Sequence, residues 1–227
     1  MAAIHLSTLK FLKDLSKHND RDWFAAHKQS YIDAQQNMCD FIDRLIIEMN
    51  KHDELDNISG KKSLYRIYND VRFSKDKSPY NPRFAFSLSR ATKFRRGGYY
   101  MSIKPGATYL GCGFFSPNPA DLNRIRQDID LNYDQWNKIL RSKNIANTFG
   151  KLAGNQLSTS PRGFDIQHPA IDLLRHKQFI LRRNFSDEEV TAPDFIKEVN
   201  KTFKAVRPFF DHMSELLTTD LNGELIV

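Results

Sequence analysis

Residues 84–88 read Phe-Ala-Phe-Ser-Leu, residues 99–103 read Tyr-Tyr-Met-Ser-Ile, and residues 108–115 read Thr-Tyr-Leu-Gly-Cys-Gly-Phe-Phe. Large apolar residues take every second position in each stretch, which is the repeat of a β-strand with one buried face. Pro105 and Gly106, between the second and third stretches, favour a tight turn. The three stretches are therefore predicted to form neighbouring antiparallel strands.

Helical patterns lie on both sides of this central region. The N-terminal pattern repeats apolar residues with the i, i+3, i+4, i+7 spacing of a buried helix face, and it consists of Met38, Phe41, Ile42, Leu45, Ile46 and Met49. Ser186 and Glu189 form a capping-box pattern before a C-terminal helical region. The predicted fold class is α+β, with an antiparallel sheet in the middle of the chain packed by N-terminal and C-terminal helices. No linker is visible, so residues 1–227 are predicted to form a single domain.

The positive charge of the chain is concentrated in one segment. The 227 residues have a formal net charge of +7, and residues 61–104 contain 12 Lys or Arg but only 2 Asp or Glu. This segment therefore carries +10, and the rest of the chain carries −3. An anionic partner would be expected to meet the protein there.

Other sequence features indicate where in the cell the protein is located and whether it needs a metal or cofactor. There is no run of 18 apolar residues, and the N-terminus lacks the pattern of a signal peptide. A cytoplasmic protein without membrane contact is expected. Cys39 and Cys112 lie far apart, and no paired Cys/His spacing occurs, so no metal site and no cofactor are expected. Cys39 falls in a helical apolar pattern and is predicted to be packing material.

Residues 66–80 form the densest polar stretch of the basic segment. As a strand, this stretch would place two arginines, a tyrosine and a carboxylate on one face, and arginine pairs suit bidentate binding of phosphate or carboxylate. Helical spacing also fits part of the stretch, so periodicity leaves its conformation open. The candidate ligand-binding residues are Arg66, Tyr68, Asp70, Arg72, Lys75, Lys77 and Tyr80. The alternative is a structural ion-pair network of Arg66, Asp70 and Arg72 on a half-buried face.

The same stretch resembles the signature of the family known as domain of unknown function 2461, found in bacteria and fungi. The resemblance extends, in chain order, to residues 20–24, 100–115, 163–165, 168–170 and 185–190. It covers nearly the whole chain and implies one domain, but it implies no activity. Asn81 stands where members of that family often have Lys.

Three functional hypotheses follow. The leading one is an uncharacterised cytosolic protein that binds a small anionic or phosphate-bearing ligand in a basic pocket. The second is an enzyme acting on such a ligand, with Asp70 or His168 as the base. His168 has Asp165 and Asp172 nearby in sequence, and a turn histidine is the alternative interpretation. The third is a nucleic-acid-binding protein that uses the basic loop at residues 90–96, where aromatic residues are interleaved. The sequence leaves the oligomeric state open.

Overall fold

The computed structural model describes residues 3–220 and 223–226. The elements, in chain order, are α1 (Leu6–Lys17), α2 (Arg21–Ala26), α3 (Lys28–Met49), α4 (Gly60–Ser63), β1 (Phe84–Ser89), β2 (Gly98–Ile103), β3 (Thr108–Phe114), α5 (Pro119–Leu131), α6 (Tyr133–Leu140), α7 (Lys143–Phe149), α8 (Ile171–Leu174), β4 (Phe179–Phe185), α9 (Asp187–Thr191), α10 (Phe195–Ala205) and α11 (Arg207–Thr218).

The four strands form one antiparallel sheet in the order β1-β2-β3-β4. The predicted α+β class, with a central sheet and helices from both ends of the chain, is confirmed. The predicted alternation is present in part: Phe86, Met101 and Leu110 are fully buried, but Ala85 and Ser102 of the alternate set are buried too. Ser87, Tyr100 and Tyr109 belong to the alternate set, and each keeps part of its surface exposed.

The chain divides into two compact units. Unit 1 comprises Met1–Leu88, Tyr100–Leu110 and Asn184–Lys201, and unit 2 comprises Ser89–Tyr99, Gly111–Arg183 and Thr202–Val227. Neither unit is one continuous stretch of sequence. The division therefore does not decide between one domain and two, and the single domain over residues 1–227 stays a prediction.

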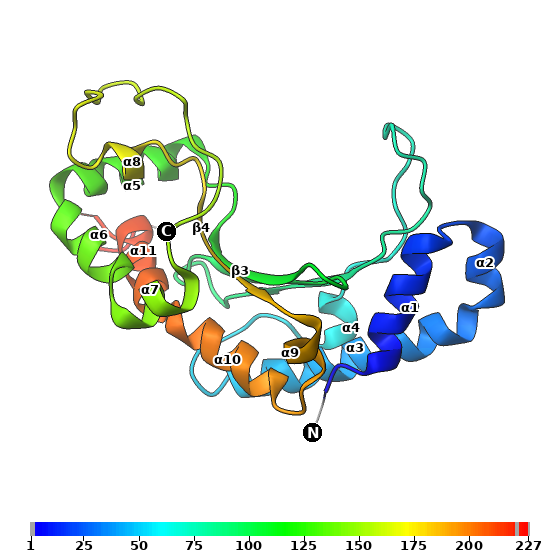
Figure 1. Cartoon of the computed structure of the whole chain (residues 1–227). Coiled ribbons are helices and arrows are strands. Elements are labelled where there is room, and N and C mark those ends of the chain that lie inside the picture. The colour runs from blue at the N-terminus through cyan, green and yellow to red at the C-terminus, as the bar shows by residue number, and fades with distance from the viewer. Residues whose placement is uncertain (1–2, 221–222, 227) are drawn as a thin grey trace. The chain divides into compact units, whose positions relative to one another are not determined.

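The core of unit 1 is built around α3. Its apolar stripe is buried as predicted, and Phe41 from this stripe stacks on Phe195, with ring centroids 5.9 Å apart. Tyr31 of α3 lies against Phe84 of β1, with centroids 6.5 Å apart. Figure 1 shows α3 and α4 beneath one face of the sheet. Cys39 is buried here, which confirms its predicted packing role, and burial raises the pKa of its thiol.

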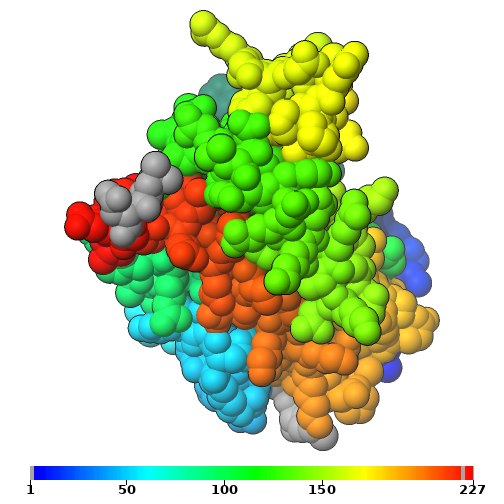
Figure 2. Space-filling model, turned by 90° about the vertical axis from the view of Figure 1, so that its left-hand side faces the viewer, coloured from blue at the N-terminus to red at the C-terminus, as the bar shows by residue number. Residues whose placement is uncertain are grey.

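The core of unit 2 is rich in aromatic side chains. Tyr99 lies between Phe203 and Phe210, at centroid distances of 4.8 and 5.1 Å. Trp136 of α6 is fully buried and contacts Phe179 and other rings. Helix α11 packs on both α5 and α6, and Figure 2 shows these helices together on one face.

Gly60, the first residue of α4, is a position where a side chain cannot be accommodated. A Cβ atom there would lie 2.3 Å from the backbone oxygen of Cys39 on α3. Alanine normally stabilises a helix more than glycine does. At this position, however, the added Cβ atom would push α4 away from α3. We predict that Gly60→Ala lowers the free energy of unfolding by about 1–3 kcal/mol, measured by urea denaturation. Lys61→Ala, at the exposed neighbouring position, is the control and should leave the midpoint unchanged.

Candidate ligand-binding site

The predicted site residues lie on a hairpin-like segment of unit 1. An isolated bridge pairs Tyr68 with Tyr80, and the amide of Asn81 donates to the carbonyl of Ile67 over 2.7 Å. Residues between these pairs form neither a helix nor a regular strand. We call residues 66–80 the basic hairpin, and Figure 1 shows it projecting beyond the helices α1 and α2 of the same unit.

The base of the basic hairpin is anchored by aromatic packing and by one asparagine. Tyr80 is buried, and its ring stacks on Phe24 with centroids 4.0 Å apart and an angle of 11° between the planes. Tyr68 contacts the same two rings, at 5.4 Å from Tyr80 and 5.9 Å from Phe24. The side chain of Asn19 donates to the Tyr80 carbonyl and accepts from the Tyr80 amide. Burial raises the pKa of Tyr80 above its ordinary value.

The charged side chains of the basic hairpin lie in solvent. Arg72 and Asp70 form a two-pronged ion pair with distances of 2.9 and 2.7 Å, although their side chains are 77% and 44% exposed. Hydrogen bonds from the side chain and the backbone amide of Arg72 hold the pKa of Asp70 below its ordinary value. Lys77 donates to the Val71 carbonyl over 2.9 Å, which closes the loop. Arg66 and Lys75 are exposed.

Two sequence interpretations of this segment need correction. The strand interpretation would bury Phe73 on the same face as Ile67, but Ile67 is buried whereas Phe73 is 96% exposed. The strand pairing ends near Tyr68 and Tyr80, so no sheet face extends to residue 73. The ion pair of Asp70 and Arg72 lies in solvent, and not on the half-buried face expected for a structural network.

A row of tyrosines lies on the sheet face of unit 1 opposite the buried one, and its first member, Tyr65, directly precedes the basic hairpin in the sequence. Tyr65 is 51% exposed, and its ring lies 6.3 Å from that of Tyr100, which in turn lies 5.7 Å from Tyr109. The Tyr65 hydroxyl donates to the Ser87 hydroxyl over 2.9 Å. Burial raises the pKa of Tyr100, and the charge of Arg83 acts in the opposite direction. We call these three rings the tyrosine row. The sequence did not indicate that Tyr65 belongs to this row or that Arg83 lies close to Tyr100.

His168 has a different partner from those considered in the sequence. Its Nε2 lies 2.8 Å from a carboxylate oxygen of Asp130 on α5, and its Nδ1 accepts from the amide of Ala170 over 3.0 Å. Asp165 instead accepts a hydrogen bond from the amide of Gln167. Both ring nitrogens of His168 are engaged, so the arrangement matches the turn histidine better than an available base.

The basic loop at residues 90–96 contributes two of its cations to the packing of unit 2. The Arg90 side chain is 2% exposed and bonds to Asp211, to Ser214 and to the carbonyl of Arg96. Arg96 pairs with Asp121. Lys93 remains exposed. Fewer cations of this loop are therefore exposed for contact with nucleic acid than the sequence indicated.

The described residues contain neither a cluster of metal-ligating side chains nor a membrane-spanning helix. In residues 3–220 and 223–226, there is no group of three or more His, Cys, Asp or Glu side chains that could hold a metal ion. Within the same part of the chain, every helix is too short or too polar to cross a membrane.

The fold and this surface define an α+β protein with an exposed basic hairpin beside a row of tyrosines. The chain belongs to the family described as conserved hypothetical protein (DUF2461), which matches residues 7–212 of the 227. The resemblance noted in the sequence is therefore confirmed. Comparison with curated proteins and with solved structures gave no match.

Arg90 and Lys93 provide a test of whether the 90–96 loop is structural. Truncation of Arg90 would remove the buried guanidinium group together with all the hydrogen bonds that it makes. Lys93 is exposed, so its truncation removes no buried group. We predict that Arg90→Ala lowers the free energy of unfolding by about 2 kcal/mol. Lys93→Ala should change it by less than about 0.5 kcal/mol. Equal stability of the two variants in urea denaturation would contradict a structural role for Arg90.

Proposed function

We propose that the protein binds a small phosphate-bearing ligand that also carries a flat ring, such as a nucleotide, on the tyrosine row and the basic hairpin of unit 1. The observation that carries this proposal is the continuous series of ring contacts from Tyr65 through Tyr100 to Tyr109, with Arg83 close enough to affect the pKa of Tyr100.

The tyrosine row supports recognition of a ring. Tyr65 is half exposed, and Tyr100 and Tyr109 keep part of their surface in solvent. Stacking of a nucleic-acid base on an aromatic side chain contributes about 1–3 kcal/mol. Contacts between neighbouring tyrosines limit their rotation, so little conformational entropy remains to be lost when a ligand ring stacks on them.

The arginines support recognition of phosphate. Arg83 is close enough to Tyr100 to affect its pKa, and Arg66 affects the pKa of Asp70 in the same way. Asp70 holds the guanidinium group of Arg72 through two hydrogen bonds. A guanidinium group can bind two phosphate oxygens through two parallel hydrogen bonds. Because Asp70 already holds the Arg72 guanidinium in place, less conformational entropy is lost when that group binds phosphate. The leading hypothesis from the sequence is thus retained, with Arg83 and the tyrosine row added to its residues.

The enzymatic alternative receives less support from these contacts. Both carboxylate oxygens of Asp70 accept hydrogen bonds from Arg72, and the lowered pKa of Asp70 makes it a weaker base. His168 has both ring nitrogens engaged. We therefore propose binding and not a reaction.

Calorimetric titration with ADP, adenosine and inorganic pyrophosphate tests the proposal. Because the site offers both a stacking surface and cations, ADP should bind more tightly than either of the other two compounds. Arg83→Ala and Arg72→Ala should each weaken ADP binding by about tenfold to a hundredfold, the loss expected when a charge-assisted hydrogen bond is removed.

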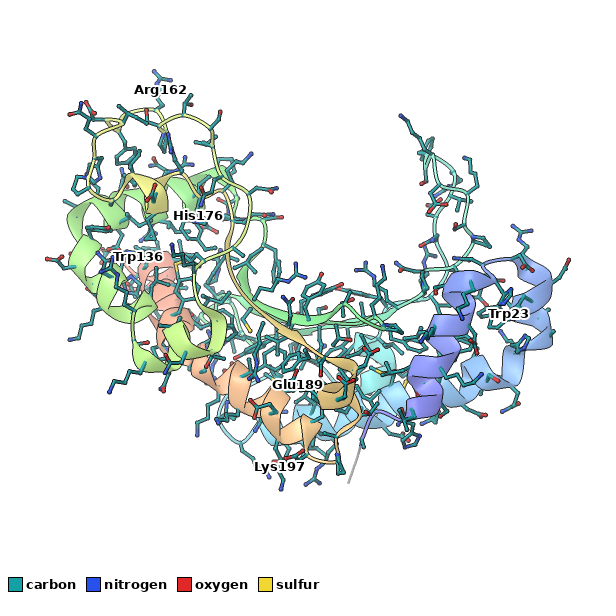
Figure 3. All side chains as sticks on the ribbon, in the orientation of Figure 1. Trp23, Trp136, Arg162, His176, Glu189 and Lys197 are labelled. Atoms are coloured by element: carbon teal, nitrogen blue, oxygen red, sulfur yellow. The ribbon has the colours of Figure 1, made fainter. Side chains whose placement is uncertain are left out.

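Lys197→Ala is the matched control, because Lys197 is an exposed cation of the same unit, on helix α10 (Figure 3). This variant should bind ADP like the unaltered protein. Equal affinity for ADP in all three variants, or no difference between ADP and pyrophosphate, would contradict the proposed site.

A further inference from the structure

Phe73 is a large apolar residue of the basic hairpin to which a single bound nucleotide gives no role. Phe73 is 96% exposed, and Tyr68 on the same hairpin is 45% exposed. Scattered exposed apolar residues are normal on a protein surface, so exposure alone does not mark Phe73 as a binding residue. The distinguishing feature of the hairpin is the set of charged side chains around these two rings.

Rings and cations alternate along the segment that leads into the basic hairpin and around it. All members of this series are exposed, and in chain order they are Tyr65, Arg66, Tyr68, Arg72, Phe73, Lys75 and Lys77. The guanidinium carbon of Arg72 lies 6.0 Å from the centroid of the Phe73 ring, so a cation and a stacking surface are neighbours there. This pattern matches a ligand in which rings and anions repeat, and single-stranded nucleic acid repeats base and phosphate.

The carboxylates of the basic hairpin do not cancel its cations. Residues 66–80 contain four Lys or Arg and two Asp, so the segment has a net charge of +2. Asp70 is engaged by Arg72, and Asp76 accepts a hydrogen bond from the Ser78 amide over 2.9 Å. A net positive charge on an exposed segment attracts a phosphate backbone.

The exposed rings of unit 1 are more numerous than one nucleotide can cover. Centroids within the tyrosine row are 6.3 and 5.7 Å apart, and Tyr68 and Phe73 provide further ring surfaces outside this row. A mononucleotide has one base and leaves most of these rings in water. Successive bases of a single strand can stack on successive aromatic side chains. A strand therefore covers ring surfaces that a mononucleotide leaves exposed.

The tyrosine row and the basic hairpin are joined through Tyr65. The Tyr65 amide donates to the Ala85 carbonyl of β1 over 2.8 Å, which fixes this residue at the edge of the sheet. Three peptide units separate Tyr65 from Tyr68, so their Cα atoms lie within about 11 Å of each other. Figure 1 shows the basic hairpin projecting away from α3 and α4, and the tyrosine row lies on the sheet face opposite these helices. A strand bound to the row can therefore continue onto the hairpin without crossing the core of unit 1.

We propose that the tyrosine row and the basic hairpin together bind single-stranded nucleic acid. Bases stack on the tyrosine row, on Tyr68 and on Phe73. The phosphates between them contact Arg66, Arg72 and Lys75. This inference rests on the proposed function, because the strand uses the same tyrosine row, and it extends the ligand from one nucleotide to several.

An anionic membrane surface fits the same observations less well. Among the aromatic residues of the basic hairpin, only Phe73 lacks a polar group, and Tyr68 lies at the base of the hairpin, where it pairs with Tyr80. A flat lipid surface that Phe73 enters would therefore leave the alternating rings and cations near the base unused.

Fluorescence anisotropy with labelled oligothymidines of different length tests the proposal. An oligomer of about twelve nucleotides should bind at least about tenfold more tightly than the thymidine dinucleotide, because it covers additional rings. A DNA duplex of the same length should bind more weakly than the single strand, because its bases are stacked on one another and cannot reach the rings.

Phe73 provides the decisive substitution. Phe73→Ser should weaken binding of the oligomer about fivefold to a hundredfold, which corresponds to the loss of one stacked base. Because Phe73 is almost fully exposed, the substitution removes no buried contact. Leu6→Ser is the matched control, since Leu6 is an apolar residue of the same unit, on helix α1, and is 73% exposed. This control variant should bind the oligomer like the unaltered protein.

The salt dependence tests the phosphate contacts separately. For single strands, the logarithm of the binding constant falls by about 0.7 per contacted phosphate for each tenfold rise in salt concentration. Lys75→Ala should therefore reduce the magnitude of this slope by about 0.7, whereas Lys197→Ala should leave the slope unchanged.

Tighter binding of the oligomer that depends on Phe73 supports the proposal. Equal affinity for the dinucleotide and the oligomer, together with binding of ADP, would overturn the strand and leave the single-nucleotide site standing. Unchanged affinity in Phe73→Ser, equal affinity for the duplex, or binding to phosphatidylserine vesicles in place of the oligomer would also overturn the strand. Absence of binding for both ADP and the oligomer would overturn this inference and the proposed function together.

Discussion

The alternation of side chains along the central strands determines what unit 1 presents to solvent. Phe86, Met101 and Leu110 must point toward the helices for their apolar surface to be buried. Successive residues of a strand point to opposite faces, so Tyr100 and Tyr109 must lie on the other face. The tyrosine row is thus a consequence of how the core is packed, and its ring contacts follow from the strand spacing.

The second constraint is the anchoring of the basic hairpin at its base. The stack of Tyr80 on Phe24 and the two hydrogen bonds of Asn19 hold the Tyr80 end of the hairpin, while the charged residues between Tyr68 and Tyr80 remain in solvent. Burial is therefore confined to the aromatic base, and the cations avoid the cost of desolvation. Arg72 and Lys77 are restrained by local hydrogen bonds, to Asp70 and to the Val71 carbonyl, and not by the core.

The sequence predicted what depends on local repeats and missed what depends on contacts between distant residues. Strand alternation around Met101 and the helical stripe around Phe41 were visible as periodic patterns, and both are buried as predicted. Tyr65 joins the tyrosine row only because an isolated bridge pairs Leu64 with Phe86, and no pattern in the sequence indicates that bridge. Asp130 lies 38 residues from His168, and only the folded chain brings them together. Residues 90–96 were assigned from the sequence to a basic loop that would contact nucleic acid, whereas the Arg90 side chain is buried and bonds to Asp211 and Ser214.

Ligand binding by the tyrosine row and Arg83 is tested most directly by mapping the amide resonances of the isotope-labelled protein during titration with ADP. We predict that the largest shifts fall at Tyr65, Arg83 and Tyr100 and along the basic hairpin, with little change at the exposed control residue Lys197. Shifts confined to other parts of the chain, or no shifts at all, would contradict it.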